Sequence, residues 1–96
     1  MATKSIITDD MEHCLLCGIS NDIEIHHVFF GTANRKISDK YGLVIPLCAY
    51  HHRGKNSVHQ NRQLDLKVKE LGQTVFENKC GSREDFMRLF GRNYID

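Results

Sequence analysis

The chain has 96 residues, 41% of them hydrophobic, and a formal net charge of +1. A chain of this length is expected to form one domain with a hydrophobic core of only marginal stability, so a further stabilising element is expected. No apolar run approaches the roughly 20 residues that a membrane-spanning helix needs, and residues 1–10 lack a signal-peptide pattern, so we expect a cytoplasmic protein with reduced thiols.

The N-terminal third of the sequence predicts a knuckle followed by a strand. Residues 1–10 are expected to form a flexible tail. Cys14 to Gly18 has the form of a metal-binding knuckle, in which the glycine allows a tight turn behind the second cysteine. Residues 23–26 alternate between apolar and polar side chains and continue into the apolar residues 28–30, which predicts a β-strand.

The next segment predicts the second half of a hairpin. Residues 31–41 are polar and basic, so we expect a loop there. Residues 43–45 are apolar and two of them are β-branched, which predicts a second strand that ends near Pro46. The two strands would pair as a hairpin with a long loop.

The remaining sequence predicts helices. Residues 49–53 predict a short helical turn that stops at Gly54, and residues 55–58 are expected to form a connecting loop. A longer amphipathic helix is predicted by an apolar stripe with i, i+4, i+7, i+11 spacing. The stripe consists of Leu64, Val68, Leu71 and Val75.

Glycine and capping residues predict where these helices begin and end. Gly72 lies inside the apolar stripe, so a break is expected there, and Gly81 is expected to end the helix. Ser82 and Asp85 have the spacing of a capping box that opens a last helix. The fold class is therefore α+β. The inner face of the last helix would hold Phe86, Leu89 and Phe90.

Two pairs of residues with two-residue spacing predict one structural zinc ion, bound by three thiolates and one imidazole in a closed tetrahedral site. The pairs are Cys14 with Cys17 and Cys48 with His51. Two disulfides, or ordinary buried cysteines, are the alternatives, but the paired spacing and the expected reducing compartment favour metal. Cys80 is expected to be a packed thiol, and His13 is a competing ligand beside the first pair.

Positive charge is concentrated in the middle of the chain. Residues 26–63 contain six lysines or arginines against one acidic residue, Asp39, and they also hold five of the six histidines. This basic segment favours a polyanion as a partner, because each neutralised phosphate releases condensed counterions. A solvated loop face is the alternative interpretation.

Two pairs of adjacent histidines direct imidazoles to different sides. His26 and His27 would face opposite sides of a strand, so one can point into the fold and the other toward a substrate. With His51 assigned to zinc, His52 is expected to point toward the strand that carries His26.

These motifs together resemble an HNH endonuclease, which has a ββα-metal fold with a treble-clef zinc site. The likeness rests on the two zinc pairs, on Glu24-Ile25-His26-His27 and on Pro46-Leu47-Cys48-x2-His51-His52. It implies a nuclease core of residues 14–59 and a helical tail of residues 60–96, in one domain of residues 11–96. Residues 53–59 and the tail are similar to phage proteins of the recombination-enhancement nuclease type, which implies a bacterial or phage-infected host cell and a phage or recombination protein as a further partner.

The resemblance implies a metal-dependent endonuclease that hydrolyses phosphodiester bonds in DNA. His27 would be the general base that activates water, and His52 would bind one catalytic divalent metal. His26 stands where the family has an aspartate ligand, which shifts the metal preference toward zinc, manganese or nickel and away from magnesium. His59 would complete a three-histidine metal site, contact phosphate, or be an ordinary surface histidine.

Other features of the family are matched less directly. The asparagine that orients the base has no counterpart beside the second strand, and Asn34 in the expected loop is a substitute. The alternative function is a catalytically inactive zinc module that binds nucleic acid or a protein partner, and a second structural zinc is the alternative role of the histidines. Five basic residues would line the approach to the site and bind the DNA backbone without reading base sequence. They are Arg35, Lys36, Lys40, Arg53 and Lys55.

Overall fold

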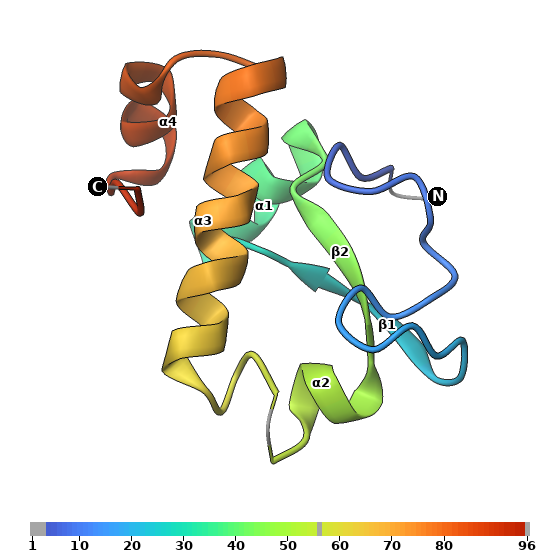
Figure 1. Ribbon diagram of the computed structural model, residues 1–96. Coiled ribbons are helices and arrows are strands. Elements are labelled where there is room, and N and C mark those ends of the chain that lie inside the picture. The colour runs from blue at the N-terminus through green and yellow to red at the C-terminus, as the bar shows by residue number, and fades with distance from the viewer. Residues whose placement is uncertain (1–3, 56, 96) are drawn as a thin grey trace.

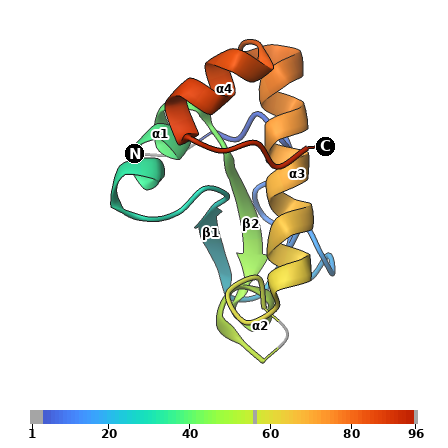
Figure 2. The same ribbon diagram turned by 90° about the vertical axis from the view of Figure 1, so that its left-hand side faces the viewer.

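The computed structural model describes residues 4–55 and 57–95, and this part of the chain forms a two-stranded sheet and four helices, which confirms the α+β class. Helix α3 stands beside the hairpin, with α2 near one end of it and α1 and α4 near the other (Figures 1 and 2). None of the helices in the described ranges has the length and apolar character needed to span a membrane. The elements are β1 (Ile23–His27), α1 (Thr32–Tyr41), β2 (Val44–Cys48), α2 (Ala49–Arg53), α3 (Arg62–Lys79) and α4 (Arg83–Phe90).

The expected hairpin is present, and its second strand is longer than predicted. Strand β1 pairs antiparallel with β2, with Ile25 opposite Pro46. The prediction that the strand ends near Pro46 is wrong, because β2 continues to Cys48. The backbone nitrogen of Pro46 points away from β1, so the missing N–H removes no hydrogen bond between the strands. The carbonyl oxygen of Pro46 accepts a hydrogen bond from the Leu15 N–H at 2.9 Å. The knuckle is thereby attached to the outer edge of β2.

The loop expected over residues 31–41 is wrong, since Thr32–Tyr41 forms helix α1. Its inward face is narrow and partly polar, so its polar composition concealed the helical pattern. Ile37 and Tyr41 pack against the core, while Ser38 is fully buried and its hydroxyl donates to the Phe29 carbonyl at 2.8 Å. Helix α1 ends at Gly42, which has a φ of 72° that favours glycine.

The break expected at Gly72 is also wrong, because α3 is continuous from Arg62 to Lys79. A Cβ at Gly72 would lie only 2.9 Å from Val28 Cγ1, so the missing side chain is what lets the helix approach the hairpin. The buried face of α3 accordingly includes Gly72 and Phe76, whereas Leu71 from the predicted stripe is 41% exposed.

Helix α4 begins at the predicted capping box, which is confirmed by reciprocal side-chain hydrogen bonds of Ser82 and Asp85. The predicted inner face is confirmed, because Phe86 and Phe90 are buried and Leu89 packs against the core as a partly buried residue. The ring centroids of Phe86 and Phe90 lie 5.1 and 4.5 Å from that of Phe29. Aromatic packing therefore joins α4 to the residues that follow β1.

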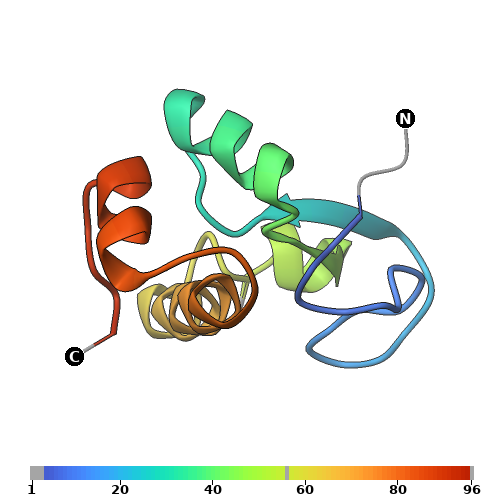
Figure 3. The same ribbon diagram turned by 90° about the horizontal axis from the view of Figure 1, so that it is seen from above.

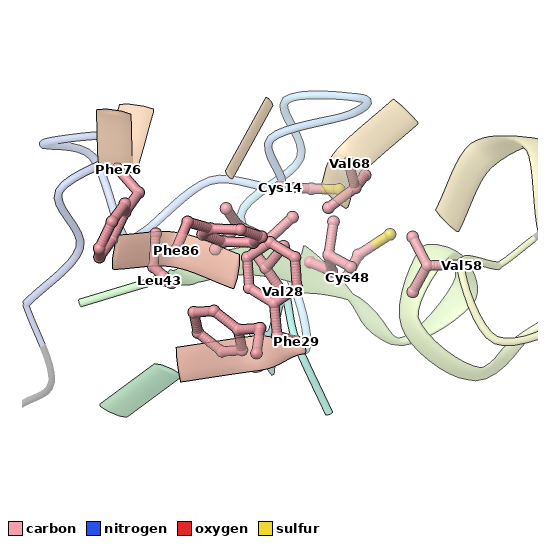
Figure 4. Close-up of a cluster of buried hydrophobic side chains, with 12 residues drawn as sticks. Cys14, Val28, Phe29, Leu43, Cys48, Val58, Val68, Phe76 and Phe86 are labelled. Carbon is pink, nitrogen blue, oxygen red and sulfur yellow. The ribbon is translucent and has the colours of Figure 1, made fainter. Parts of the chain in front are cut away.

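The hydrophobic core reaches from these aromatic rings to two of the cysteines. Cys14 and Cys48 belong to the buried cluster and are at most 3% exposed. Figure 4 shows them at the opposite end of the cluster from Phe76. The packing of the core therefore continues directly into the predicted zinc site.

The N-terminal segment has no helix or strand over residues 4–10, but part of it is packed. Ile6 and Ile7 pack against the core, and the Ile6 N–H donates to the Gly42 carbonyl at 2.9 Å. This differs from the expected flexible tail, because two apolar side chains gain more from burial than from exposure. Figure 3 shows the segment across the hairpin from α4. Three predicted segments extend outside the described residues, at residues 1–3, 56 and 96.

Replacing Gly72 with alanine tests whether close packing or helix propensity dominates in α3. Alanine favours a helix by about 1 kcal/mol, but the added Cβ would overpack against Val28 at a cost of about 1 to 3 kcal/mol. We expect a net loss of unfolding free energy of up to about 2 kcal/mol in urea denaturation. Thr74→Ala on the exposed face of α3 is the control, expected within about 0.5 kcal/mol of wild type. A stabilised Gly72→Ala variant would contradict the packing interpretation.

Candidate functional site

The four predicted zinc ligands lie together, and this Cys₃His cluster could hold a metal ion such as zinc. One donor atom from each residue lies within 4.8 Å of all the others. Cys17 Sγ and Cys48 Sγ are 3.8 Å apart, and Cys48 Sγ is 3.3 Å from His51 Nδ1. A tetrahedral zinc ion with bonds of about 2.3 Å to sulfur sets its sulfur atoms about 3.8 Å apart. The observed separations fit such an ion. The cluster consists of Cys14, Cys17, Cys48 and His51.

Backbone turns bring the two halves of the Cys₃His cluster together. The knuckle is closed by the Gly18 N–H, which donates to the Cys14 carbonyl at 2.8 Å, and Gly18 has a φ of 82°. On the other side, Cys48 ends β2 and His51 lies in the short helix α2 that follows directly. Strand, turn and knuckle therefore each fix part of the cluster.

The backbone also prepares the first cysteine to bind a cation. Burial acts to raise the pKa of the Cys14 thiol, but nearby backbone N–H groups, first that of Cys48, outweigh burial and lower the pKa to about 6. A thiol with this pKa is largely thiolate at neutral pH, which is the form that binds metal.

Two other residues considered for this region do not belong to the cluster. His13 faces Asp10, with 2.8 Å between Nδ1 and Oδ2, so it is not the ligand beside Cys14. Cys80 was expected to be packed but is exposed, because it lies at the C-cap of α3 beyond the last helical turn.

A second cluster contains three histidines from different parts of the chain. His26 comes from β1, His52 from α2 and His59 from the segment before α3, and their donor atoms also lie within 4.8 Å of one another. The ring centroids are 5.1 to 5.2 Å apart. His26, His52 and His59, called here the histidine cluster, are therefore brought together, which is one of the three arrangements that the sequence left open for His59.

His26 is the most unusual member of the histidine cluster. It is 1% exposed, and its buried Nε2 has no hydrogen-bond partner among the described residues. Burial, followed by the nearby His52 and His59, lowers the pKa of His26 to about 3. A neutral imidazole with an unsatisfied buried nitrogen is the form that binds a metal ion.

His52 is connected to a carboxylate from β1. Its Nδ1 lies 2.6 Å from Glu24 Oε1, and Arg53 donates to both oxygens of the same carboxylate from Nε at 3.0 Å and Nη2 at 2.6 Å. Arg53, followed by His52, holds the pKa of Glu24 below its ordinary value, so the carboxylate is ionised. This network was missed in the sequence, although Glu24 and His26 share one face of a strand because they are two residues apart.

His27 faces a different partner. Its Nε2 lies 2.7 Å from Asp39 Oδ1, which reaches it from α1. Asn34, the substitute predicted for this role, is not among the residues lining the cavity around the histidines in the described structure. One sequence feature could have indicated the contact of Asp39 with His27, namely that Asp39 is the one acidic residue in the basic segment 26–63.

A cavity of about 710 Å³ joins these groups. The histidine cluster and the pair of His27 with Asp39 line it together, and Arg35 and Lys36 line it from α1. Phe30, 40% exposed, contributes an aromatic surface. The cavity therefore contains candidate metal ligands, a candidate base and positive charge.

The other basic residues predicted to line the approach are placed differently. Lys40 and Lys55 are exposed and are not among the described residues that line the cavity. Arg53 is likewise absent from the lining, because its guanidinium is directed to Glu24. Lys40 lies one helical turn beyond Lys36, in the last turn of α1, and this places its charge further along the helix.

Comparison with known proteins finds no matching family model, no similar curated protein and no similar solved structure. Function is therefore inferred from the side chains of the two clusters and the cavity.

Removing a ligand of the Cys₃His cluster is expected to unfold the protein. Structural zinc contributes about 10 to 16 kcal/mol of binding free energy in small domains, which is comparable to the whole stability of a fold. We expect Cys48→Ser to lose one equivalent of zinc in elemental analysis and most of its helical circular dichroism. Cys80→Ser is the matched control and should keep both. A folded wild-type protein purified without zinc would contradict the metal assignment.

Proposed function

We propose that the protein is a metal-dependent HNH endonuclease that hydrolyses phosphodiester bonds in DNA. The observation that carries the proposal is the shared cavity, in which the histidine cluster, the His27 and Asp39 pair and two basic side chains face one space. The antiparallel pair of β1 and β2, joined through α1 and followed by α2, with the Cys₃His cluster beside it, supports the resemblance to the ββα-metal fold.

The histidine cluster would hold the catalytic metal. The unpartnered Nε2 of His26 supports this role, because a buried polar atom without a partner is costly unless a ligand satisfies it. A divalent ion bound there would neutralise the charge that develops on the scissile phosphate and on the leaving oxygen. Three imidazole ligands favour zinc, manganese or nickel over magnesium.

His27 would act as the general base. An ionised carboxylate can only accept, so the contact with Asp39 places the proton of His27 on Nε2 and leaves the lone pair on Nδ1. Nδ1 would then accept a proton from the attacking water, while Asp39 keeps the ring in the required tautomer and stabilises the charged form.

Arg35 and Lys36 would position the DNA. Both lie in α1 and line the cavity beside the histidines. Their charges would contact backbone phosphates, which gives affinity without sequence information. Such contacts favour hydrolysis with little base specificity.

A plasmid-nicking assay across added zinc, manganese, nickel and magnesium tests the proposal. Wild-type protein should nick, and His27→Ala should lower the rate by about 10² to 10⁴-fold, the usual contribution of a general base. The zinc content and the circular dichroism of His27→Ala should be the same as those of wild type. His13→Ala, which removes an exposed histidine outside the cavity, should keep full activity. If the wild-type protein binds DNA but does not cut it with any of these metals, the protein is an inactive binding module and the proposed endonuclease activity is refuted.

Asp39→Asn tests the orientation of the base. An asparagine amide can donate to Nε2 and move the proton to Nδ1, which blocks the base, so we expect kcat to fall by about tenfold or more. The affinity for DNA should not fall, because the change removes a negative charge near the substrate. Asp9→Asn, on the exposed N-terminal segment, is the control. An unchanged kcat would show that Asp39 does not position His27.

A further inference from the structure

Glu24 belongs to neither cluster, yet it contacts a member of the histidine cluster directly. Its Oε1 lies 2.6 Å from Nδ1 of His52, and the two side chains are only 30% and 18% exposed. Both side chains are thus partly shielded from water, and a hydrogen bond with an ionised partner is stronger than one between two neutral groups.

The contact determines which nitrogen of His52 can bind a metal. An ionised carboxylate has no proton to donate, so Nδ1 of His52 must carry the hydrogen. The lone pair of the ring then lies on Nε2. This is the nitrogen with which His52 can bind a metal ion together with His26 and His59. The pair of carboxylate and histidine has the form that supports metal-binding histidines from behind.

Arg53 fixes Glu24 in this position. It donates from Nε to Oε1 and from Nη2 to Oε2, so both carboxylate oxygens are engaged and the group cannot rotate freely. The guanidinium is mostly exposed, whereas the carboxylate it contacts is turned toward the histidines. Arg53 therefore acts on the histidine cluster through Glu24.

We infer that Glu24 is a positioning residue for metal binding at the histidine cluster, holding His52 as the Nδ1–H tautomer with Nε2 directed to the metal, and that Arg53 supports it. The inference rests on the metal site of the proposed function and adds two residues to it. It also gives Arg53 a structural role in place of the predicted contact with DNA.

Metal titration measures the role of Glu24 without any cleavage assay. The protein is first loaded with one equivalent of zinc to fill the Cys₃His cluster and is then titrated with cobalt. Glu24→Ala should weaken cobalt binding about 10 to 100-fold, the usual effect of losing a carboxylate behind a metal-bound histidine. Glu24→Gln should lie between Ala and wild type, because its amide oxygen can still accept from Nδ1. Glu70→Ala, an exposed carboxylate on α3, should bind as wild type.

The tautomer of His52 provides a second, independent measurement. Two-dimensional ¹H–¹⁵N spectra of the histidine rings, recorded with zinc in the Cys₃His cluster only, should show the proton of His52 on Nδ1 in wild type and a mixture of tautomers in Glu24→Ala. A proton on Nε2 in wild type would overturn the inference, as would unchanged cobalt affinity in both Glu24 variants.

His52→Ala separates this inference from the proposed function. If His52→Ala removes cobalt binding while the Glu24 variants bind normally, the positioning role fails and the metal site stands. If His52→Ala leaves cobalt binding unchanged, the metal site of the proposed function fails, and the tautomer of His52 still decides whether Glu24 orients that ring.

Discussion

The antiparallel pairing of β1 with β2 fixes which histidine is buried and which reaches Asp39. His26 lies opposite Ile45 and His27 opposite Val44, and a slip of one residue would exchange the faces on which the two imidazoles lie. The same register ends β2 at Cys48, from which α2 continues without a loop. One set of strand contacts therefore positions ligands of both clusters.

The hydrophobic core supports the cavity from behind. The chain leaves β1 with two adjacent aromatic residues that diverge, so Phe29 enters the core while Phe30 borders the cavity. The ring of Phe30 lies 5.1 Å from that of His59, and Lys69 Nζ lies 4.0 Å above it. The packing of α3 and α4 against Phe29 thus also determines the position of Phe30 in the lining of the cavity.

Local spacing in the sequence was sufficient to predict the Cys₃His cluster, since two ligand pairs two residues apart need only a strand and a turn to meet. The start of the last helix was predictable for the same reason, because its capping box consists of two residues only three positions apart in the sequence. Helix α1 was not, because its buried stripe is short and includes Ser38. Asp39 and Glu24 were missed because their contacts join distant segments, and composition carries no information on which carboxylate meets which histidine.

The short helix α2 carries consecutive histidines that serve different clusters, His51 with the cysteines and His52 with the other imidazoles. Successive residues of a helix point about 100° apart, so the two directions are tied to one backbone turn. An insertion or deletion between Cys48 and His51 would rotate both rings away from their partners at once. The number of residues in this turn is therefore constrained by both clusters.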